Sequence, residues 1–247
     1  MLVCLHQTAS SSRMYEAFMT RARSDYQLIA LDTPGFGGSP ALPEAPSIGD
    51  LVEVLSDAVA ALGHSAYHLL GHHTGAAIAC EWAATHPENV RSLAMIGALA
   101  MGPEERERWL QGVEPAPIRE DGSHLTAAWQ RVANIDAQPV QSPPDPELRH
   151  REAVDVLLAT PRWPEAYRAV FTQDFERHYA AVRCPILLMC GPEDVLWPYF
   201  DRTAELRPDA HAVELPGGAY VLDQQPEAVL SALREFHSSL AVTSQRL

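Results

Sequence analysis

The 247-residue sequence contains no lysine, so all 18 of its basic side chains are arginines. Chemistry that needs a lysine amine is therefore excluded: a Schiff base, a lysine general base and a phosphate-binding loop with its lysine. Acidic residues number 32, which gives a formal charge of −14 at pH 7. Nucleic acids and anionic membranes bind cationic surfaces, so this acidic excess argues against both as partners.

Long apolar runs are also missing, because no stretch approaches the roughly 18 residues of a membrane span. The apolar start of the chain is too short, and has no basic lead, for a signal peptide. The cysteines do not show the paired spacing of metal ligands; they are Cys4, Cys80, Cys184 and Cys190. We interpret them as buried free thiols of a reducing compartment, which predicts a cytoplasmic protein.

Short apolar runs alternate with segments of helical spacing. The strand-like runs lie at 2–5, 26–31, 67–70, 93–96, 186–190 and 211–215. The helical segments lie at 14–22, 51–62, 76–84 and 228–240, and Ser47 with Asp50 forms an acidic capping box before the second of them. This alternation predicts an α/β fold: a mostly parallel sheet flanked by helices, with catalytic loops at the carboxyl ends of the strands.

The alternation fails between residues 102 and 183. This stretch is rich in Glu, Arg, Pro and Trp, and helical spacing recurs at 104–110, 125–132, 152–159 and 165–175. It is too long for a connecting loop. We therefore expect a core of residues 1–101 and 184–247, with 102–183 inserted as a helical lid over the strand ends.

The informative turn is Gly71-His-His73-Thr-Gly75, where a strand continues directly into a helix. Two glycines four residues apart around a polar residue fit a tight strand-to-helix turn, the nucleophile elbow, which lifts the central side chain above the sheet. The central residue of such a turn commonly has a positive φ, which histidine tolerates better than most residues. The turn therefore predicts an exposed imidazole at His73, where a serine would be expected.

Several segments, taken with this turn, resemble the α/β-hydrolase family. Leu5-His6-Gln7-Thr8 is similar to its oxyanion loop, Asp32 to Ser39 is similar to its D-x-x-G-x-G-x-S turn, and 191–198 is similar to the loop that carries the catalytic acid, at Asp194. The resemblance implies the α/β-hydrolase fold. It begins at the family's third strand, so the N-terminal hairpin is missing and the run at 26–31 becomes a sheet edge. A homodimer would cover that edge; an incorrectly assigned start codon is the other explanation.

Two positions depart from the family pattern. The nucleophile position is His73, and the position of the histidine in the C-terminal loop, 215–227, falls on Ala219, followed by Tyr220. A Ser-His-acid triad needs the imidazole to take the hydroxyl proton and the carboxylate to orient that imidazole. Here only Asp194 remains, so hydrolysis through an acyl-serine is excluded at this position.

The remaining groups predict acid–base chemistry on a small carbonyl compound, without a cofactor. We expect His73 to act as general base, Asp194 to orient it and Tyr220 to donate a proton. Backbone N–H groups of Thr74 and of the Gln7–Thr8 turn would stabilise an oxyanion. This set predicts lyase, isomerase or cyclase-type chemistry. Hydrolysis by a histidine-activated water and ligand binding without turnover are the two alternatives.

Six further side chains are candidates for contacting the substrate: His6, His72, His124, Trp129, Arg131 and Trp197. His6 also suits a hydrogen bond to the turn backbone, His72 suits packing, and Trp129 suits the core of the lid. A metal site is not expected, since the adjacent pair His72–His73 lies on a turn and has no helical partner at the usual spacing.

Overall fold

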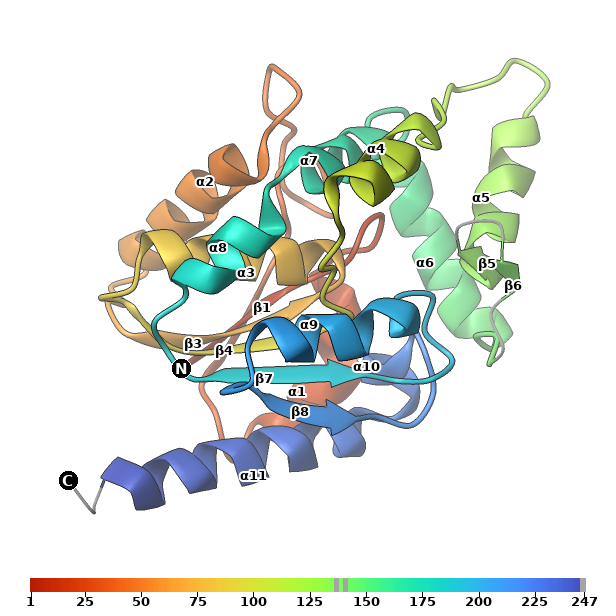
Figure 1. The fold of residues 1–247 in the computed structure, drawn as a ribbon. Coiled ribbons are helices and arrows are strands. Elements are labelled where there is room, and N and C mark those ends of the chain that lie inside the picture. Colours follow the sequence, from red (N-terminus) through yellow and green to blue (C-terminus); the bar gives the residue numbers. More distant parts are fainter. Residues whose placement is uncertain (136–137, 140–141, 245–247) are drawn as a thin grey trace.

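The computed structural model describes residues 1–135, 138–139 and 142–244. Within these residues, one six-stranded sheet has the order β2-β1-β3-β4-β7-β8, and every neighbouring pair is parallel (Figure 1). The strands are β1 (Leu2–Leu5), β2 (Leu28–Leu31), β3 (Tyr67–His72), β4 (Val90–Ile96), β7 (Ile186–Cys190) and β8 (His211–Glu214). The predicted parallel α/β sheet is confirmed.

Helices cover both faces of the sheet because alternate strand residues point to opposite sides. Val3 and Leu5 pack with α2 (Ile48–Ala61), α3 (Thr74–Thr85) and α8 (Phe175–Ala181), whereas Leu2 and Cys4 pack with helices of the other face. That second face carries η1 (Ser12–Tyr15), α1 (Glu16–Ala22), α10 (Val221–Gln224) and α11 (Pro226–Ser244). After β7, η2 (Trp197–Tyr199) leads into α9 (Phe200–Leu206). Both apolar clusters are buried, so the sheet is the shared centre of the core.

Helix boundaries differ from the sequence pattern where caps and polar anchors decide them. The capping box of Ser47 and Asp50 forms and starts α2 at Ile48. The helical spacing predicted at 165–175 breaks into two helices at Gln173, whose backbone is extended, and the side-chain amide of Gln173 donates to the carbonyl oxygen of Ala77 and to Glu81 of α3. Periodicity alone does not register such a break.

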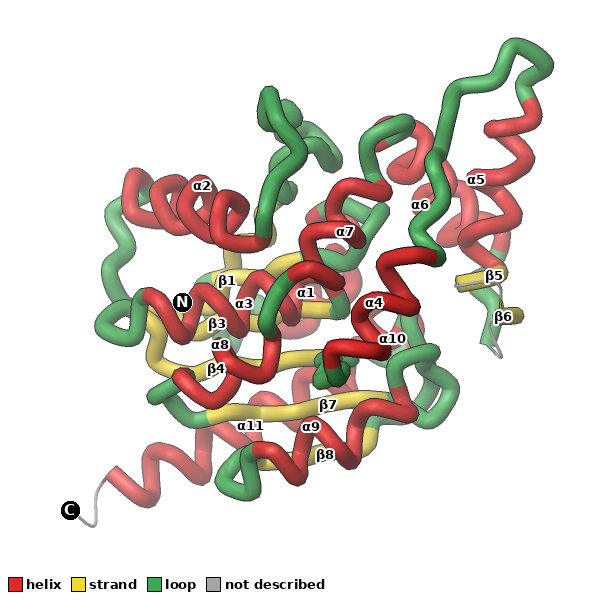
Figure 2. Tube along the Cα trace, turned by 45° about the horizontal axis from the view of Figure 1, so that its top comes forward, coloured by secondary structure: helices red, strands yellow, loops and turns green. Residues whose placement is uncertain are grey.

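The segment between β4 and β7 is mainly helical. It contains α4 (Pro103–Gln111), α5 (Ser123–Ala133), the short pair β5 (Asn134–Ile135) and β6 (Gln138–Pro139), α6 (Pro146–Ala159), α7 (Pro164–Thr172) and α8. In Figures 1 and 2, α5 and α6 lie beyond the end of the sheet toward which β7 and β8 point. Apolar side chains of α5, α6 and α7 pack there against Ala9 and Phe36 of the loops that follow β1 and β2.

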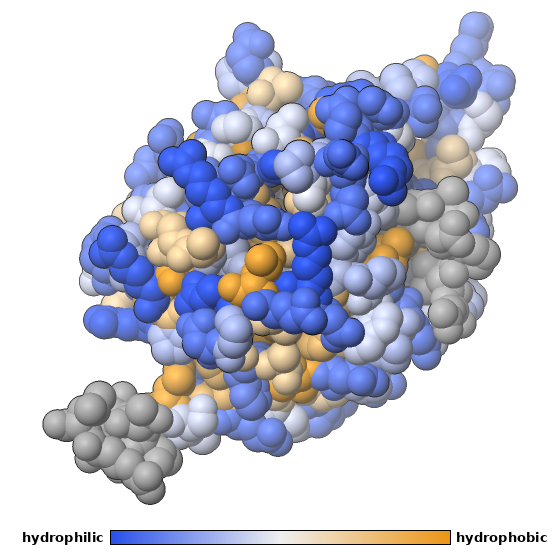
Figure 3. Space-filling view, viewed as in Figure 1, coloured by the Kyte–Doolittle hydropathy of each residue, from blue (hydrophilic) through white to orange (hydrophobic). Residues whose placement is uncertain are grey.

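The surface and the sheet edges fit the composition. The face in Figure 3 is largely hydrophilic, with apolar side chains in small groups. In the described part of the chain, no helix is long and apolar enough to cross a membrane. The four cysteines are free thiols, as expected, and three are buried. Strand β2 is an edge strand with partly exposed residues, and a homodimer through it stays a prediction.

The turn between β3 and α3 brings two stretches of backbone into close contact. A Cβ atom on Gly75 would lie 2.0 Å from the carbonyl oxygen of Leu5, and one on Gly71 would lie 2.2 Å from the carbonyl oxygen of Gly75. Only glycine therefore lets α3 begin directly against the end of β1. This contact fixes the height at which His73 stands above the sheet.

Gly75→Ala should therefore destabilise the fold by about 3 kcal/mol or more, the upper end of the usual cost of overpacking. The matched control is Gly38→Ala, whose Cβ would lie 3.6 Å from the Asp32 carboxylate, an ordinary contact. Urea denaturation followed by circular dichroism measures both free energies of unfolding. Equal losses of stability in the two variants would contradict the proposed backbone contact.

Candidate active site

His73 occupies the turn between β3 and α3 with φ +49°, and it is the one non-glycine residue with a positive φ in the described chain. Its N–H donates to the carbonyl oxygen of Ile96, at 2.9 Å, which ties the turn to the end of β4. Gly97 follows Ile96, and a Cβ atom on it would lie 2.4 Å from the ring of His73. The glycine thus leaves the space that the imidazole occupies.

The imidazole of His73 points to Asp194, in the loop after β7. Nε2 lies 3.0 Å from Oδ1 and 2.9 Å from Oδ2 of the carboxylate, and Oδ1 also accepts the N–H of Leu196 at 2.8 Å. Burial raises the pKa of Asp194, but the neighbouring His73 outweighs it, so the net pKa is below its ordinary value. An ionised carboxylate can only accept, so Nε2 carries a proton, and in the neutral form of the ring the lone pair is on Nδ1.

A small chamber lies beside His73, with a volume of about 20 Å³. This is about the space that one buried water molecule needs. The side chain of His73 keeps 11% of its surface exposed, whereas that of Asp194 keeps 1%. The chamber is lined by Gln7, Thr8, Ala9, His73, Arg131, Val132, Glu152, Val156, Tyr167 and Tyr220.

Of the three residues expected to form an oxyanion hole, two line this chamber and the third, Thr74, contacts one of them. Gln7 and Thr8 line it, and the hydroxyl of Thr8 donates to that of Thr74 over 2.9 Å. Thr74 is the first residue of α3. The N–H groups of a first helical turn have no acceptor within the helix, and this end of the helix is partially positive. The oxyanion hole at these residues stays a prediction, and the start of α3 directly after His73 is compatible with it.

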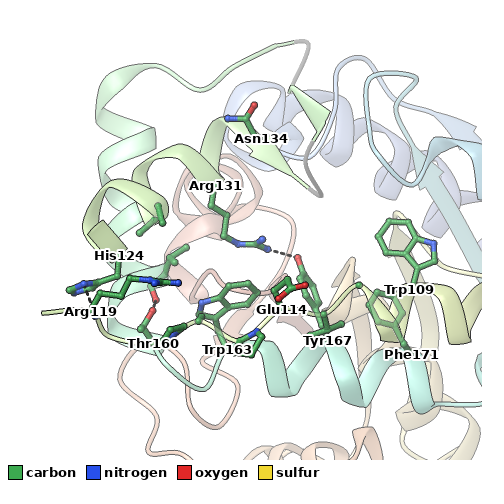
Figure 4. Close-up of a pocket in the computed structure, with 18 of the residues that line it drawn as sticks. Trp109, Glu114, Arg119, His124, Arg131, Asn134, Thr160, Trp163, Tyr167 and Phe171 are labelled. Carbon is green, nitrogen blue, oxygen red and sulfur yellow. Dashed lines mark hydrogen bonds between the residues drawn. The ribbon is translucent and has the colours of Figure 1, made fainter. Parts of the chain in front are cut away.

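A larger cavity of about 580 Å³ adjoins the chamber and shares Arg131, Val156 and Tyr167 with it (Figure 4). Arg131 donates to the hydroxyl of Tyr167 over 2.6 Å, and its guanidinium carbon lies 4.2 Å from the centre of the Trp163 ring. His124 also lines this cavity, and its Nδ1 accepts the N–H of Arg119. Two of the predicted substrate-contacting residues, His124 and Arg131, are thus brought to one cavity.

Other predicted site residues lie elsewhere. Trp129 is exposed and stacks under Arg149 outside both cavities, and the ring of Trp197 stacks on Phe200. His6 is buried between backbone groups: one ring nitrogen lies 2.8 Å from the Gln7 carbonyl oxygen and the other accepts the N–H of Thr33. These contacts give His6 a role in holding the loops that follow β1 and β2.

Tyr220 forms part of the chamber wall, but its hydroxyl donates to the carbonyl oxygen of Val132 over 2.7 Å. Burial raises the pKa of this phenol further above its ordinary value. The hydroxyl proton of Tyr220, which was expected to be donated in catalysis, is therefore hydrogen-bonded to the backbone. Sequence spacing identifies the position of Tyr220 beside the site but not the direction of its hydroxyl.

His72, His73 and Asp194 also deserve comparison with a metal site, since a ligand atom of each lies within 4.8 Å of the others. Among the described residues, both ring nitrogens of His72 are buried without a hydrogen-bond partner, and burial lowers its pKa well below the ordinary value. However, the two imidazoles stack, with centroids 4.3 Å apart and planes inclined by 25°. A metal lies in the plane of each ring it binds, about 2 Å from the nitrogen, and stacked planes do not meet there. The cluster fits a stacked imidazole pair better than a metal centre.

Two polar residues of the chamber, Glu152 and Tyr167, were not predicted from the sequence. Glu152 accepts hydrogen bonds from Ser10 and from Arg151, which also pairs with Asp223 of α10. Burial raises the pKa of Glu152 from 4.5 to about 7, against the opposing effect of Arg151. The sequence did contain a sign that Glu152 is buried: it lies four residues before the apolar Val156, and therefore on the same face of the helix.

Comparison with known proteins agrees with the fold. A family model described as alpha/beta hydrolase fold matches residues 1–115. A protein of Klebsiella pneumoniae subsp. pneumoniae named "Putative carbamate hydrolase RutD" is 30% identical over 208 residues, covering 79% of this chain and 74% of that protein. The protein of the same name from Enterobacter cloacae subsp. cloacae is 29% identical over 231 residues, covering 87% of this chain and 83% of its own length.

Solved structures show the same architecture. A thermophilic esterase from Thermogutta terrifontis matches 96% of this chain and 89% of its own, with a TM-score of 0.80 and 21% sequence identity. The sheet, the elbow and these relatives together define the class. The chain belongs to the α/β-hydrolase fold family and is an enzyme of that superfamily.

Glu152→Gln should change the pH dependence of stability. Between its unfolded pKa, 4.5, and its folded pKa, about 7, the folded state keeps a proton that the unfolded state has released, so rising pH destabilises the wild type. This shift corresponds to about 3 kcal/mol. The amide cannot ionise, so the stability of the variant relative to wild type should rise by that amount between about pH 5 and pH 8.

Urea denaturation at both pH values measures this difference, with Glu147→Gln, an exposed position on the same helix, as the control. Carboxyls that do not interact with Glu152 contribute equally in wild type and variant, so their contributions cancel. A pH dependence of stability that is the same in wild type and Glu152→Gln would show that Glu152 titrates normally.

Proposed function

We propose that the protein is a hydrolase in which His73, oriented by Asp194, activates a water molecule directly, without an acyl-serine intermediate. On this view it is an atypical member of its family, with histidine at the nucleophile position and no histidine at Ala219. The observation that carries the proposal is the contact of His73 with Asp194, at 2.9 Å, beside a chamber that holds about one water. Within the described residues, no hydroxyl side chain hydrogen-bonds to His73, so a water is the nucleophile that the site favours.

The reaction needs two proton transfers. Nδ1 of His73 takes a proton from the water while its oxygen attacks the carbonyl carbon of the substrate, and Asp194 stabilises the imidazolium that forms. The negative oxygen of the tetrahedral intermediate would lie at the start of α3, near the N–H of Thr74 and the Gln7–Thr8 turn. When the intermediate collapses, His73 returns the proton to the leaving group, and an acid and an alcohol or amine are released.

Residues 102–183 are proposed to act as the lid of this site. Their helices supply Arg131, Glu152 and Tyr167 to the chamber wall, opposite the loop that contains Thr8. A wall of this kind excludes bulk water, which strengthens the electrostatic interactions inside. The larger cavity, lined almost entirely by the same segment, would hold the body of the substrate.

Hydrolysis is preferred to the lyase, isomerase or cyclase chemistry for two reasons. The water-sized chamber supplies a place for the second reactant of a hydrolysis, and relatives carry the names of a carbamate hydrolase and an esterase. The substrate is accordingly proposed to be a small ester, amide or carbamate. Tyr220 becomes part of the wall, because its hydroxyl is engaged by Val132.

His73→Gln should lower the hydrolysis rate of unactivated phenyl esters and carbamates by roughly 10²–10⁴-fold, the usual contribution of a general base. Asp194→Asn should lower it as well, because an amide does not stabilise the imidazolium. The measurement is kcat over a panel of such compounds. His150→Gln, an exposed histidine of α6, is the control and should retain the wild-type rate.

Two further measurements distinguish the alternatives. Hydrolysis in ¹⁸O-labelled water should place the label in the acid product, whereas an elimination or isomerisation would give an unlabelled product. A serine-directed fluorophosphonate should leave the enzyme active. Stoichiometric labelling of a serine, or a wild-type rate in His73→Gln, would refute the proposed mechanism, and tight ligand binding without any turnover would favour a binding protein.

A further inference from the structure

Arg131 lies at the boundary between the chamber and the larger cavity, and lines both. In Figure 4 its side chain points from α5 toward Tyr167, across the cavity that Trp163 also lines. The guanidinium lies over two aromatic rings, 4.2 Å from the centre of Trp163 and 5.3 Å from that of Tyr167. These contacts hold the charged group in one place before any ligand arrives.

Arg131 lacks a carboxylate partner within the described residues. Other partly buried arginines of the same segment are paired: Arg151 with Glu152 and Asp223, and Arg162 with Glu165. Arg131 donates instead to the neutral hydroxyl of Tyr167, at 2.6 Å. A guanidinium has five N–H donors in a planar fork suited to a carboxylate, so Arg131 retains donors for an anion.

The charge of the cavity differs from that of the whole protein. Three arginines line it, Arg108, Arg119 and Arg131, and Glu114 is the one carboxylate in the described lining. The chain as a whole carries a formal charge of −14. A positively charged cavity attracts an anionic ligand. The acidic composition of the chain would not lead one to expect such a cavity.

Aromatic side chains form much of the remaining wall: Trp109, Trp163, Tyr167 and Phe171. The volume of about 580 Å³ lies within the range of small-molecule sites, and apolar walls with a few placed polar groups are typical of them. Flat rings pack well against such a wall in stacked or edge-to-face geometry. The body of the ligand is therefore expected to be aromatic.

The position of Arg131 indicates how far a bound anion would lie from the bond that reacts. Tyr167, which accepts from Arg131, donates to the carbonyl oxygen of Thr8 over 3.3 Å, and Thr8 contacts Thr74 beside His73. An anionic group on Arg131 would therefore lie at the chamber end of the cavity, near the carbonyl that His73 and its water attack. The aromatic body would extend away from it into the cavity.

We infer that the substrate is an aromatic acid whose carboxylate lies next to the ester, amide or carbamate bond that is cleaved, with Arg131 binding that carboxylate. This inference rests on the proposed hydrolase function of the same site. N-acyl or N-carbamoyl derivatives of aromatic amino acids have this arrangement of groups.

The experiment compares two ligands of nearly the same shape, N-acetyl-L-phenylalanine and N-acetyl-L-phenylalaninamide, which differ in the charge of one group. Binding is followed by the fluorescence of the protein, because Trp109 and Trp163 line the cavity and phenylalanine does not interfere. Wild type should bind the acid roughly 10- to 100-fold more tightly than the amide, the usual range for hydrogen bonds to a charged group. Arg131→Gln should abolish this preference.

Arg149→Gln is the matched control. Arg149 stacks on Trp129 at 4.4 Å, the same kind of contact, but neither residue lines the chamber or the larger cavity, so its loss should leave the preference intact. Thermal unfolding checks that each variant is folded. If Arg131→Gln does not fold, Arg131→Lys keeps the charge without the planar fork and should show a reduced preference.

Equal affinity of wild type for acid and amide, undetectable binding of both at millimolar concentrations, or an unchanged preference in Arg131→Gln would overturn the inference. His73→Gln separates it from the proposed function. Loss of hydrolysis with the acid preference retained supports both. Retained hydrolysis in His73→Gln, with a preference that still depends on Arg131, would refute the proposed function alone.

Discussion

The position of the whole site depends on one close contact of backbones, where the start of α3 meets the end of β1. Because Gly75 has no side chain, its Cα approaches the carbonyl oxygen of Leu5, and His73 is held in a conformation, φ +49°, that L-residues seldom adopt. Such conformations persist only where the surroundings over-determine them. Here the core on both faces of the sheet supplies that constraint, and the imidazole is presented above the sheet as a consequence.

Asp194 completes the arrangement from a distant part of the sequence. It follows β7, which is separated from the elbow by one strand of the sheet, so the two side chains meet at the same edge. Burial of a carboxylate costs free energy unless it is compensated, and here His73 and the N–H of Leu196 provide the compensation. The same contacts fix the ring of His73, so the stability of the carboxylate and the orientation of the base have one origin.

The sequence predicts the fold well because each layer leaves a local pattern. The apolar runs and helical spacing outside residues 102–183, together with the Ser47–Asp50 capping box, agree with the structure apart from helix boundaries. The region of the elbow is likewise predictable, since glycine spacing reflects backbone contact. What the pattern does not predict is how α5 and α6 are placed against the strand ends, because that depends on packing between segments far apart in sequence.

The errors of side-chain placement follow from this. Trp129 and Arg131 lie two residues apart on α5, so they project from different sides of the helix, and only Arg131 faces the cavities. The hydroxyl of Tyr220 is directed to backbone by the packing of α5. Glu152 was overlooked because an acidic residue in a polar segment is normally exposed, and only its position on the apolar face of α6 indicates burial.

Arg131 and Glu152 respond differently to pH. A guanidinium keeps its charge at every working pH, so recognition of an anion by Arg131 would not vary as pH changes. The buried carboxyl of Glu152, whose pKa is raised to about 7, is by contrast a group of the chamber that changes charge near neutrality. A change in KM near neutral pH would then report events at Glu152 or in the substrate. Because Arg131 and Glu152 lie on different elements, α5 and α6, substitutions at the two positions should separate anion recognition from its pH dependence.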